Sequence, residues 1–248
     1  MRASENWMWG LARPLAVVVK EHTAKTLLEA VFEKGGLQFS IEGIELNSGR
    51  NSPYRLGIGP MMDAETTLLI GGAFADVIVA EGLECDMLGA DAYQGIPIAV
   101  ATSIALLRSY GISVEMVFVR KEMKRHAEGG RLIGPSPKGK KIVFVDNALS
   151  SGKAFELAFE AVYAEAQPEL QVVGNVVMLD REERGLDDTR SAAQKILDVY
   201  GVRTHSVLKR RDVMARLEMP STILHGVSEE DRQRLLVLME HYHARHGA

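Results

Sequence analysis

The chain has 248 residues, a net charge of −4 and a single cysteine, and these facts limit its function. The length fits one large domain or two small ones, and the acidic balance gives no general reason to expect nucleic-acid binding. Cys85 alone excludes an intrachain disulfide and a multi-cysteine metal site, and it favours a reducing compartment. No apolar run approaches the roughly 18–20 residues that cross a bilayer. We therefore expect a cytoplasmic protein that binds neither nucleic acid nor membrane.

Helical and strand patterns then alternate along the chain. A first helix is expected between Thr23, which fits an N-cap, and the stop signal Gly35–Gly36. Residues 37–46 alternate loosely between apolar and polar side chains, which is typical of one or two short strands. Strands that alternate with helices predict a parallel sheet with helices on both faces, here in one domain. The further helices are predicted at about 63–80, 96–110, 187–199 and 227–245, and the further strands at 86–90, 114–119, 142–145, 172–179 and 202–208.

The stretch from Lys141 to Ala154, KIVFVDNALSSGKA, has the features of a ligand site. Its apolar run at 142–145 is typical of a strand buried in a parallel sheet, and two polar residues, Asp146 and Asn147, follow it. A short loop at 148–152 then leads into a helix, whose dipole and free N–H groups favour a phosphate. The same pattern also fits a plain turn without a ligand. Further donors would be the hydroxyls of Ser150 and Ser151 and the ammonium group of Lys153.

A long basic segment, Arg120 to Gly134, follows the predicted strand at 114–119. It has five permanent positive charges and two negative ones, which leaves +3 in a net-acidic chain. Gly129 and Gly130 favour mobility, and the prolines and glycine between 135 and 139 argue against regular structure. A loop of this length is either a lid over a site or a solvated charged surface.

Three turns are expected to meet at one edge of the sheet, because the carboxyl ends of parallel strands open on the same side. They are the turns at 90–95, 120–134 and 146–152. Together they would supply a phosphate cradle, a carboxylate that faces a sugar or Mg²⁺, and a cationic arm. These groups suit a phosphorylated sugar with a polyanionic leaving group, whose developing charge the arm would stabilise.

Five segments resemble those of the orotate phosphoribosyltransferases, in the same order and with about the same spacing. Residues 146–154 resemble the phosphoribosyl-pyrophosphate motif of the type I phosphoribosyltransferases. RKEMKRHAEGG at 120–130 is similar to the catalytic loop RKEAKDHGEGG of the orotate family. The other three segments are NSGRNSPY at 47–54, similar to KSGRKSPY, ADAYQGIP at 90–97, similar to PAYKGIP, and LDREERG at 179–185, similar to LDRQERG.

The resemblance implies the α/β type I phosphoribosyltransferase fold, in which helices flank a parallel-core sheet and an N-terminal hood is added. Within a single domain over 1–248, about 1–60 would form an extension and the hood, 61–210 the core, and 211–248 the C-terminal helices. The implied reaction joins orotate to phosphoribosyl pyrophosphate and gives orotidine 5′-phosphate and pyrophosphate. It uses Mg²⁺, bound mainly through the substrate, in a homodimer with shared active sites.

The family's functional positions carry over residue by residue. The catalytic positions would be Lys121, Lys124, His126 and Asp146. The substrate-binding positions would be Asn47, Arg55, Tyr93, Gln94, Arg120, Asn147, Ser150, Ser151, Gly152, Lys153, Ala154 and Arg181. Among these, Arg181 would contact the orotate carboxylate, and the segment from Ser150 to Ala154 would bind the 5′-phosphate.

Several of these positions depart from the family pattern. Asn47 and Gln94 stand where the family has lysines, and Asn147 replaces the second acid of an Asp-Asp pair. Loss of one well-placed charged group can cost about 10²–10³ in rate. Three readings therefore stay open: a working orotate enzyme, a non-catalytic relative that binds a phosphoribosyl ligand or nucleotide as a regulatory or partner subunit, and a transferase for another base. Lys153 and Arg55 could replace the lost positive charge.

Overall fold

The computed structural model describes residues 23–121, 130–186, 188–219 and 222–248. A six-stranded sheet at its centre has the order β5-β4-β3-β6-β7-β8. All neighbouring strands are parallel except β4 and β5, which are antiparallel. The strands are β3 (Met87–Asp91), β4 (Glu115–Val119), β5 (Leu132–Ile133), β6 (Lys141–Leu149), β7 (Gln171–Asp180) and β8 (Thr204–Lys209).

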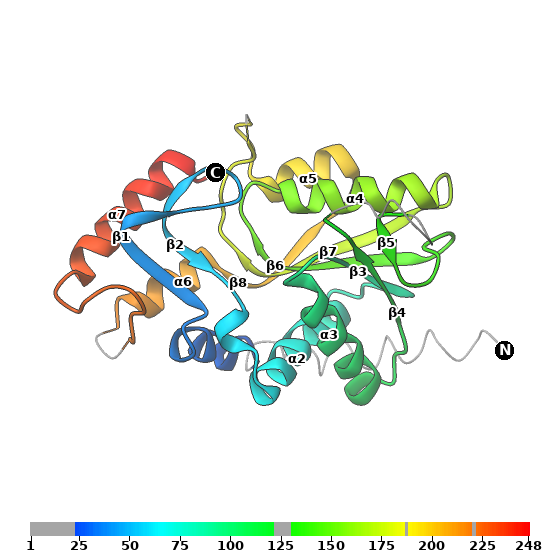
Figure 1. The fold of residues 1–248 in the computed structure, drawn as a ribbon, viewed down its shortest axis with the longest axis horizontal. Helices are drawn as coiled ribbons and strands as arrows, with labels where there is room; N and C mark the ends of the chain where they lie inside the picture. The colour runs from blue at the N-terminus through cyan, green and yellow to red at the C-terminus, as the bar shows by residue number, and fades with distance from the viewer. Residues whose placement is uncertain (1–22, 122–129, 187, 220–221) are drawn as a thin grey trace.

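Helices cover both faces of this sheet (Figure 1). The central strand β6 shows why, because its apolar run is buried on both sides. Val143 and Val145 pack in the cluster beneath α2 and α3, whereas Ile142 and Phe144 pack in the cluster beneath α4 and α5. The prediction of a doubly covered parallel sheet is confirmed. The four helices are α2 (Ala64–Ala80), α3 (Gly95–Tyr110), α4 (Lys153–Ala166) and α5 (Ala192–Tyr200).

A smaller unit at one end of the sheet combines segments from both ends of the described chain (Figure 1). Its hairpin is antiparallel, and α7 packs on both of its strands. Residues 23–33 are helical, and Glu29 in this helix pairs with Arg216 at 2.9 Å. The hood therefore includes C-terminal elements beside the hairpin. Its elements are β1 (Leu37–Glu45), β2 (Asn51–Leu56), η1 (Gly59–Met61), α6 (Arg210–Leu217) and α7 (Arg232–His246).

Two predicted loops contain more regular structure than expected. Strand β6 continues through Asp146 and Asn147, because the long neighbour β7 pairs with it as far as Leu149, opposite Asp180. The basic segment contains β5, whose two residues pair with the end of β4. The expectation that this whole segment lacks regular structure was therefore wrong, and the antiparallel pairing fixes its C-terminal part against the sheet.

Helix α5 begins later than its apolar pattern predicted. The hydroxyl of Ser191 accepts the N–H of Gln194 at 3.0 Å and caps the helix at that point. Before the cap, Arg184 and Ser191 form an isolated antiparallel bridge. Among the described residues, no helix combines the length and apolarity that a bilayer crossing requires.

Candidate functional site

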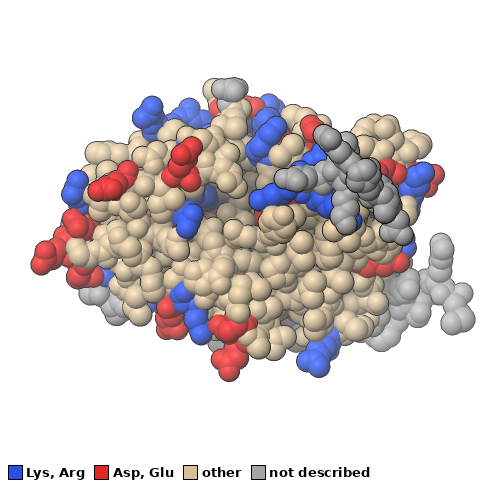
Figure 2. Space-filling model, in the orientation of Figure 1, with Lys and Arg blue, Asp and Glu red and all other residues tan. Residues whose placement is uncertain are grey.

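A cavity of about 520 Å³ opens at the carboxyl ends of β3, β4 and β6. The turn after β3, both described ends of the basic segment, and the connection from β6 to α4 line it together. The predicted convergence of three turns is confirmed. On the face shown in Figure 2, several lysine and arginine side chains gather right of centre in the upper half of the view.

The cavity brings together the predicted site residues that the structure describes. Two of the predicted residues, Lys124 and His126, lie outside the described ranges. Sequence reasoning missed Asp91 and Arg131, which also line the cavity. The sequence contains an indication for each of them. Asp91 directly follows a predicted buried strand, as Asp146 does, and Arg131 belongs to the basic segment. The predicted residues in the lining are Asn47, Arg55, Tyr93, Gln94, Arg120, Lys121, Asp146, Asn147, Ser150, Ser151, Gly152, Lys153, Ala154 and Arg181.

The start of α4 has the features of an anion site. Gly152 occupies the N-cap position with φ of +84°, a left-handed conformation that glycine adopts at low cost. No side chain caps this helix, so N–H groups of its first turn have no partner within the helix. Ser151 is buried beside them and also lines the cavity. This geometry suits a phosphate group.

Two carboxyl groups line the site: Asp91 ends β3, and Asp146 lies in the C-terminal part of β6. Burial raises the pKa of Asp146 to about 7, against the effect of the Asn147 N–H that donates to its Oδ1 at 2.7 Å. The nearby carboxylate of Asp91 adds to this increase. Burial also raises the pKa of Asp91, and the positive charges of Lys121 and Arg131 oppose that shift. Asp91 is thus electrostatically coupled both to Asp146 and to the basic segment.

The basic segment places at the cavity an arginine with two nitrogens that have no partner among the described residues. Nε and Nη1 of Arg120 are buried, and neither has a hydrogen-bond partner among the residues the structure describes. The backbone N–H of Arg120 donates to the carbonyl of Arg131 at 2.7 Å, which holds the two ends of the segment together. Nζ of Lys121 lies 5.0 Å from the ring centre of Tyr93. Buried donors without a partner are costly, and an anionic ligand would satisfy these two nitrogens.

Two of the departures from the family pattern contact each other. Asn147 Nδ2 donates to Gln94 Oε1 at 2.8 Å and to the carbonyl of Leu56 at 3.2 Å. The same Gln94 oxygen accepts the backbone N–H of Ile58 at 3.1 Å. An uncharged amide pair therefore joins the end of β6 to the β3–α3 turn and to the residues after β2.

The two suggested replacement cations lie in the lining but already have partners. Nε of Arg55 donates to Gln38 Oε1 at 2.8 Å. Nζ of Lys153 lies 4.0 Å from a carboxylate oxygen of Glu156. Both side chains are exposed, so the hydrogen bond of Arg55 and the ion pair of Lys153 can give way to contacts with a ligand.

Arg181 lies in the wall of the cavity with most of its side chain buried. Its Nε donates to Glu183 Oε1 at 2.6 Å, and its Nη2 donates to Ser52 Oγ at 2.7 Å. Its guanidinium also lies 4.0 Å from the ring centre of Tyr54 and donates to the carbonyl of that residue. These contacts fix its position relative to β2. The predicted contact with an orotate carboxylate stays a prediction.

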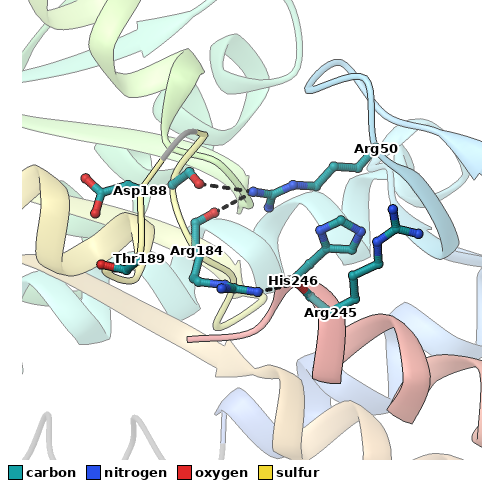
Figure 3. Close-up of a pocket in the computed structure, with 7 residues that line it drawn as sticks. Arg50, Arg184, Asp188, Thr189, Arg245 and His246 are labelled. Carbon is teal, nitrogen blue, oxygen red and sulfur yellow. Dashed lines mark hydrogen bonds between the residues drawn. The ribbon is translucent and has the colours of Figure 1, made fainter.

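The buried carboxylate of Glu183 connects this wall to the hood. Its Oε2 accepts from Arg50 Nη1 at 2.9 Å and from the Tyr242 hydroxyl at 3.2 Å. Figure 3 shows two further contacts of this region. Arg50 donates to the carbonyl groups of Arg184 and Gly185 after β7, and Arg184 donates to the carbonyl of Arg245. The hollow drawn there, of about 350 Å³, lies where Arg50 before β2, the turn after β7 and the C-terminal residues meet.

Comparison with known proteins gives the family context. An orotate phosphoribosyltransferase of Hamiltonella defensa subsp. Acyrthosiphon pisum (strain 5AT) is 34% identical over 183 residues, 74% of this chain and 82% of that protein. One of Yarrowia lipolytica (strain CLIB 122 / E 150) is 33% identical over 213 residues, 85% of this chain and 92% of that protein. The crystal structure of orotate phosphoribosyltransferase from Francisella tularensis has a TM-score of 0.68 at 22% identity, with 90% of this chain and 100% of that chain covered. No family model matches the sequence.

Proposed function

The chain belongs to the orotate phosphoribosyltransferase family, and from this premise we propose that it transfers the phosphoribosyl group of phosphoribosyl pyrophosphate to orotate. The products would be orotidine 5′-phosphate and pyrophosphate. One observation supports the proposal most: Asp146, the uncapped start of α4 and Arg120 all line one cavity, and two buried nitrogens of Arg120 have no partner among the described residues. The type I phosphoribosyltransferase fold provides this arrangement.

In this mechanism each group contacts one part of the substrate. The loop before α4 binds the 5′-phosphate through its N–H groups and the hydroxyl of Ser151. Asp146 accepts hydrogen bonds from the ribose hydroxyls. As the bond from ribose C1 to the pyrophosphate oxygen breaks, pyrophosphate leaves with the electron pair. A ring nitrogen of orotate forms the new bond to C1 and releases its proton to the departing pyrophosphate. Arg120 and Lys121 stabilise the negative charge that develops on the leaving oxygens.

Mg²⁺, a homodimer and a cytoplasmic location belong to the same proposal. Mg²⁺ prefers oxygen ligands and binds through one or two carboxylates together with substrate phosphates, and the cavity offers carboxylates at Asp91 and Asp146. When bound, the cation would neutralise charge on the pyrophosphate. Support for a dimer with shared sites comes from the resemblance of 120–130 to a loop that serves the neighbouring subunit. The single cysteine supports a reducing cytoplasm.

A second candidate function is binding of a phosphoribosyl ligand without turnover. The hydrogen bond between Gln94 and Asn147 favours it, because both amides are used within the protein at positions where the family has charged groups. A transferase for another base is a further variant of this alternative.

We expect the purified protein to consume orotate when Mg²⁺ and phosphoribosyl pyrophosphate are present, measured as loss of orotate absorbance together with release of pyrophosphate. Parallel reactions with uracil and adenine test the choice of base. Tight binding of phosphoribosyl pyrophosphate without turnover of any base would favour the binding protein. Turnover of another base alone would contradict the choice of orotate.

Replacing Gly152 with alanine is expected to raise the KM for phosphoribosyl pyrophosphate about tenfold. The nearest atom to a Cβ there, in Ile196, lies 3.6 Å away, so the change acts through the backbone and not through a clash. A left-handed conformation costs alanine about 1–2 kcal/mol, which would turn the N–H groups of the loop away from the phosphate. Steady-state kinetics measure the effect.

Gly201→Ala is the matched control for this variant. Gly201 also has a positive φ, of +69°, with nothing within 4 Å of a Cβ, but it ends α5 outside the cavity lining. We expect a similar loss of stability and an unchanged KM. An equal rise of KM in both variants would show that the effect is not local to the phosphate loop.

A further inference from the structure

Asp91 and Asp146 occupy equivalent places on two neighbouring parallel strands. In the ladder between β3 and β6, Ala90 is paired with Val145, so the two acids are the next residues of their strands. Neighbouring strands lie about 4.8 Å apart, and both acids line the same cavity. The electrostatic coupling of the two carboxyl groups agrees with this proximity. Two adjacent carboxylates repel each other, and either a proton on one of them or a cation between them relieves the repulsion.

Asp91 also faces the cationic side of the cavity. Lys121 and Arg131, at the two described ends of the basic segment, are the positive groups that act on it. Arg120, the first residue of that segment, has two buried nitrogens, Nε and Nη1, without a partner in the described parts of the chain. These two donors are independent of the acids, and an anion would satisfy them. A ligand that satisfies both sides combines a divalent cation with phosphate oxygens.

Asn147 offers a neutral amide oxygen in place of a carboxylate, and contacts of its Nδ2 fix the orientation of that amide. Its side-chain amide is held by Gln94 and by the carbonyl of Leu56. Position 147 corresponds to the second acid of the similar motif. Asp91 stands where the similar segment PAYKGIP has its first proline. The carboxylate that β6 lacks at position 147 is therefore present on the neighbouring strand β3, at Asp91.

We propose that Asp91 and Asp146 together bind the divalent cation that accompanies phosphoribosyl pyrophosphate, with Asp91 replacing the acid that residue 147 lacks. The inference rests on the proposed function for the identity of the ligand. Asp91 contacts the cation on the side of the basic segment, and Asp146 contacts it on the side of the ribose. Arg120 then binds the pyrophosphate oxygens on the same cation.

The test measures Mn²⁺ binding by electron paramagnetic resonance, with and without phosphoribosyl pyrophosphate, so it does not depend on turnover. In the presence of that ligand, Asp91→Asn should weaken Mn²⁺ binding about tenfold or more. Glu84→Gln is the matched control, because Glu84 is an exposed acid that precedes β3, at the opposite end of the strand from Asp91. It should bind Mn²⁺ as the unchanged protein does.

A double variant, Asp91→Pro with Asn147→Asp, moves the carboxylate to the other strand. It should regain most of the Mn²⁺ affinity that Asp91→Asn loses, and circular dichroism checks that each variant is folded. If Asp91→Asn does not fold, the double variant decides. Mn²⁺ affinity close to that of the unchanged protein supports the inference, and weak Mn²⁺ binding by a folded double variant overturns it. Wild-type Mn²⁺ affinity in folded Asp91→Asn also overturns it.

These outcomes are distinct from those of the activity assay. Turnover of orotate together with Mn²⁺ binding that is indifferent to Asp91 would overturn the cation site and leave the proposed function standing. Binding that depends on Asp91 in a protein that turns over no base would support the cation site and contradict the transferase.

Discussion

Replacing Glu183 with alanine is expected to lower the free energy of unfolding by about 3–5 kcal/mol, because it leaves buried cations without their partner. The side chain of Glu183 is 1% exposed, and its two oxygens bind Arg181 at 2.6 Å and Arg50 at 2.9 Å. For a chain of this size the loss corresponds to a fall in Tm of roughly 6–20 °C. Thermal unfolding followed by circular dichroism measures it.

Glu84→Ala is the control for the loss of Glu183, since Glu84 pairs with Lys141 at 3.2 Å and both side chains are about half exposed. Such a surface pair is worth about 0–1 kcal/mol. An equally small effect of Glu183→Ala would contradict the account of the buried network. Because Glu183 also fixes Arg181, a milder variant, Glu183→Gln, should weaken orotate binding more than phosphoribosyl pyrophosphate binding.

Replacing Arg120 with methionine should change activity and stability in opposite directions. The guanidinium of Arg120 is expected to stabilise the leaving pyrophosphate, and loss of such a group costs about 10²–10³ in kcat. The same variant removes a buried donor without a partner among the described residues, which should raise the free energy of unfolding by about 1–3 kcal/mol. Steady-state kinetics and urea unfolding measure the two effects.

Arg108→Met controls for loss of an arginine elsewhere. Arg108 lies exposed in the last turn of α3 and does not line the cavity. Its replacement should leave kcat unchanged and alter stability by no more than about 0.5 kcal/mol. A loss of stability in Arg120→Met would show that the guanidinium has a partner in the folded protein, and its role as a ligand-binding cation would then be wrong.

Sequence periodicity was sufficient to predict the sheet and the place of the site. The apolar run at 142–145 is typical of a strand buried on both faces of a sheet, and parallel strands bring their carboxyl ends to one edge. Asp146 and the loop before α4 follow from these two facts. Local signals were therefore enough wherever the chemistry sits at the end of a strand.

Contacts between distant segments could not be read from the sequence. The hydrogen bond between Gln94 and Asn147 joins residues 53 positions apart. The hydrogen bond from Arg181 to the hydroxyl of Ser52 joins residues 129 positions apart. The late start of α5 depends on a cap at Ser191, whereas the apolar pattern alone extends further. Such features depend on which elements meet in the fold, and the pattern of each element does not encode that.

The central claim is that a sugar phosphate binds between the start of α4, Asp146 and the basic segment. A crystal structure of the protein with Mg²⁺ and phosphoribosyl pyrophosphate tests this claim most directly. We predict the 5′-phosphate against the N–H groups after Gly152, the ribose beside Asp146 and the pyrophosphate against Arg120. Ligand density in the hollow between Arg184 and Arg245, with the cavity at the edge of the sheet left empty, would contradict the account.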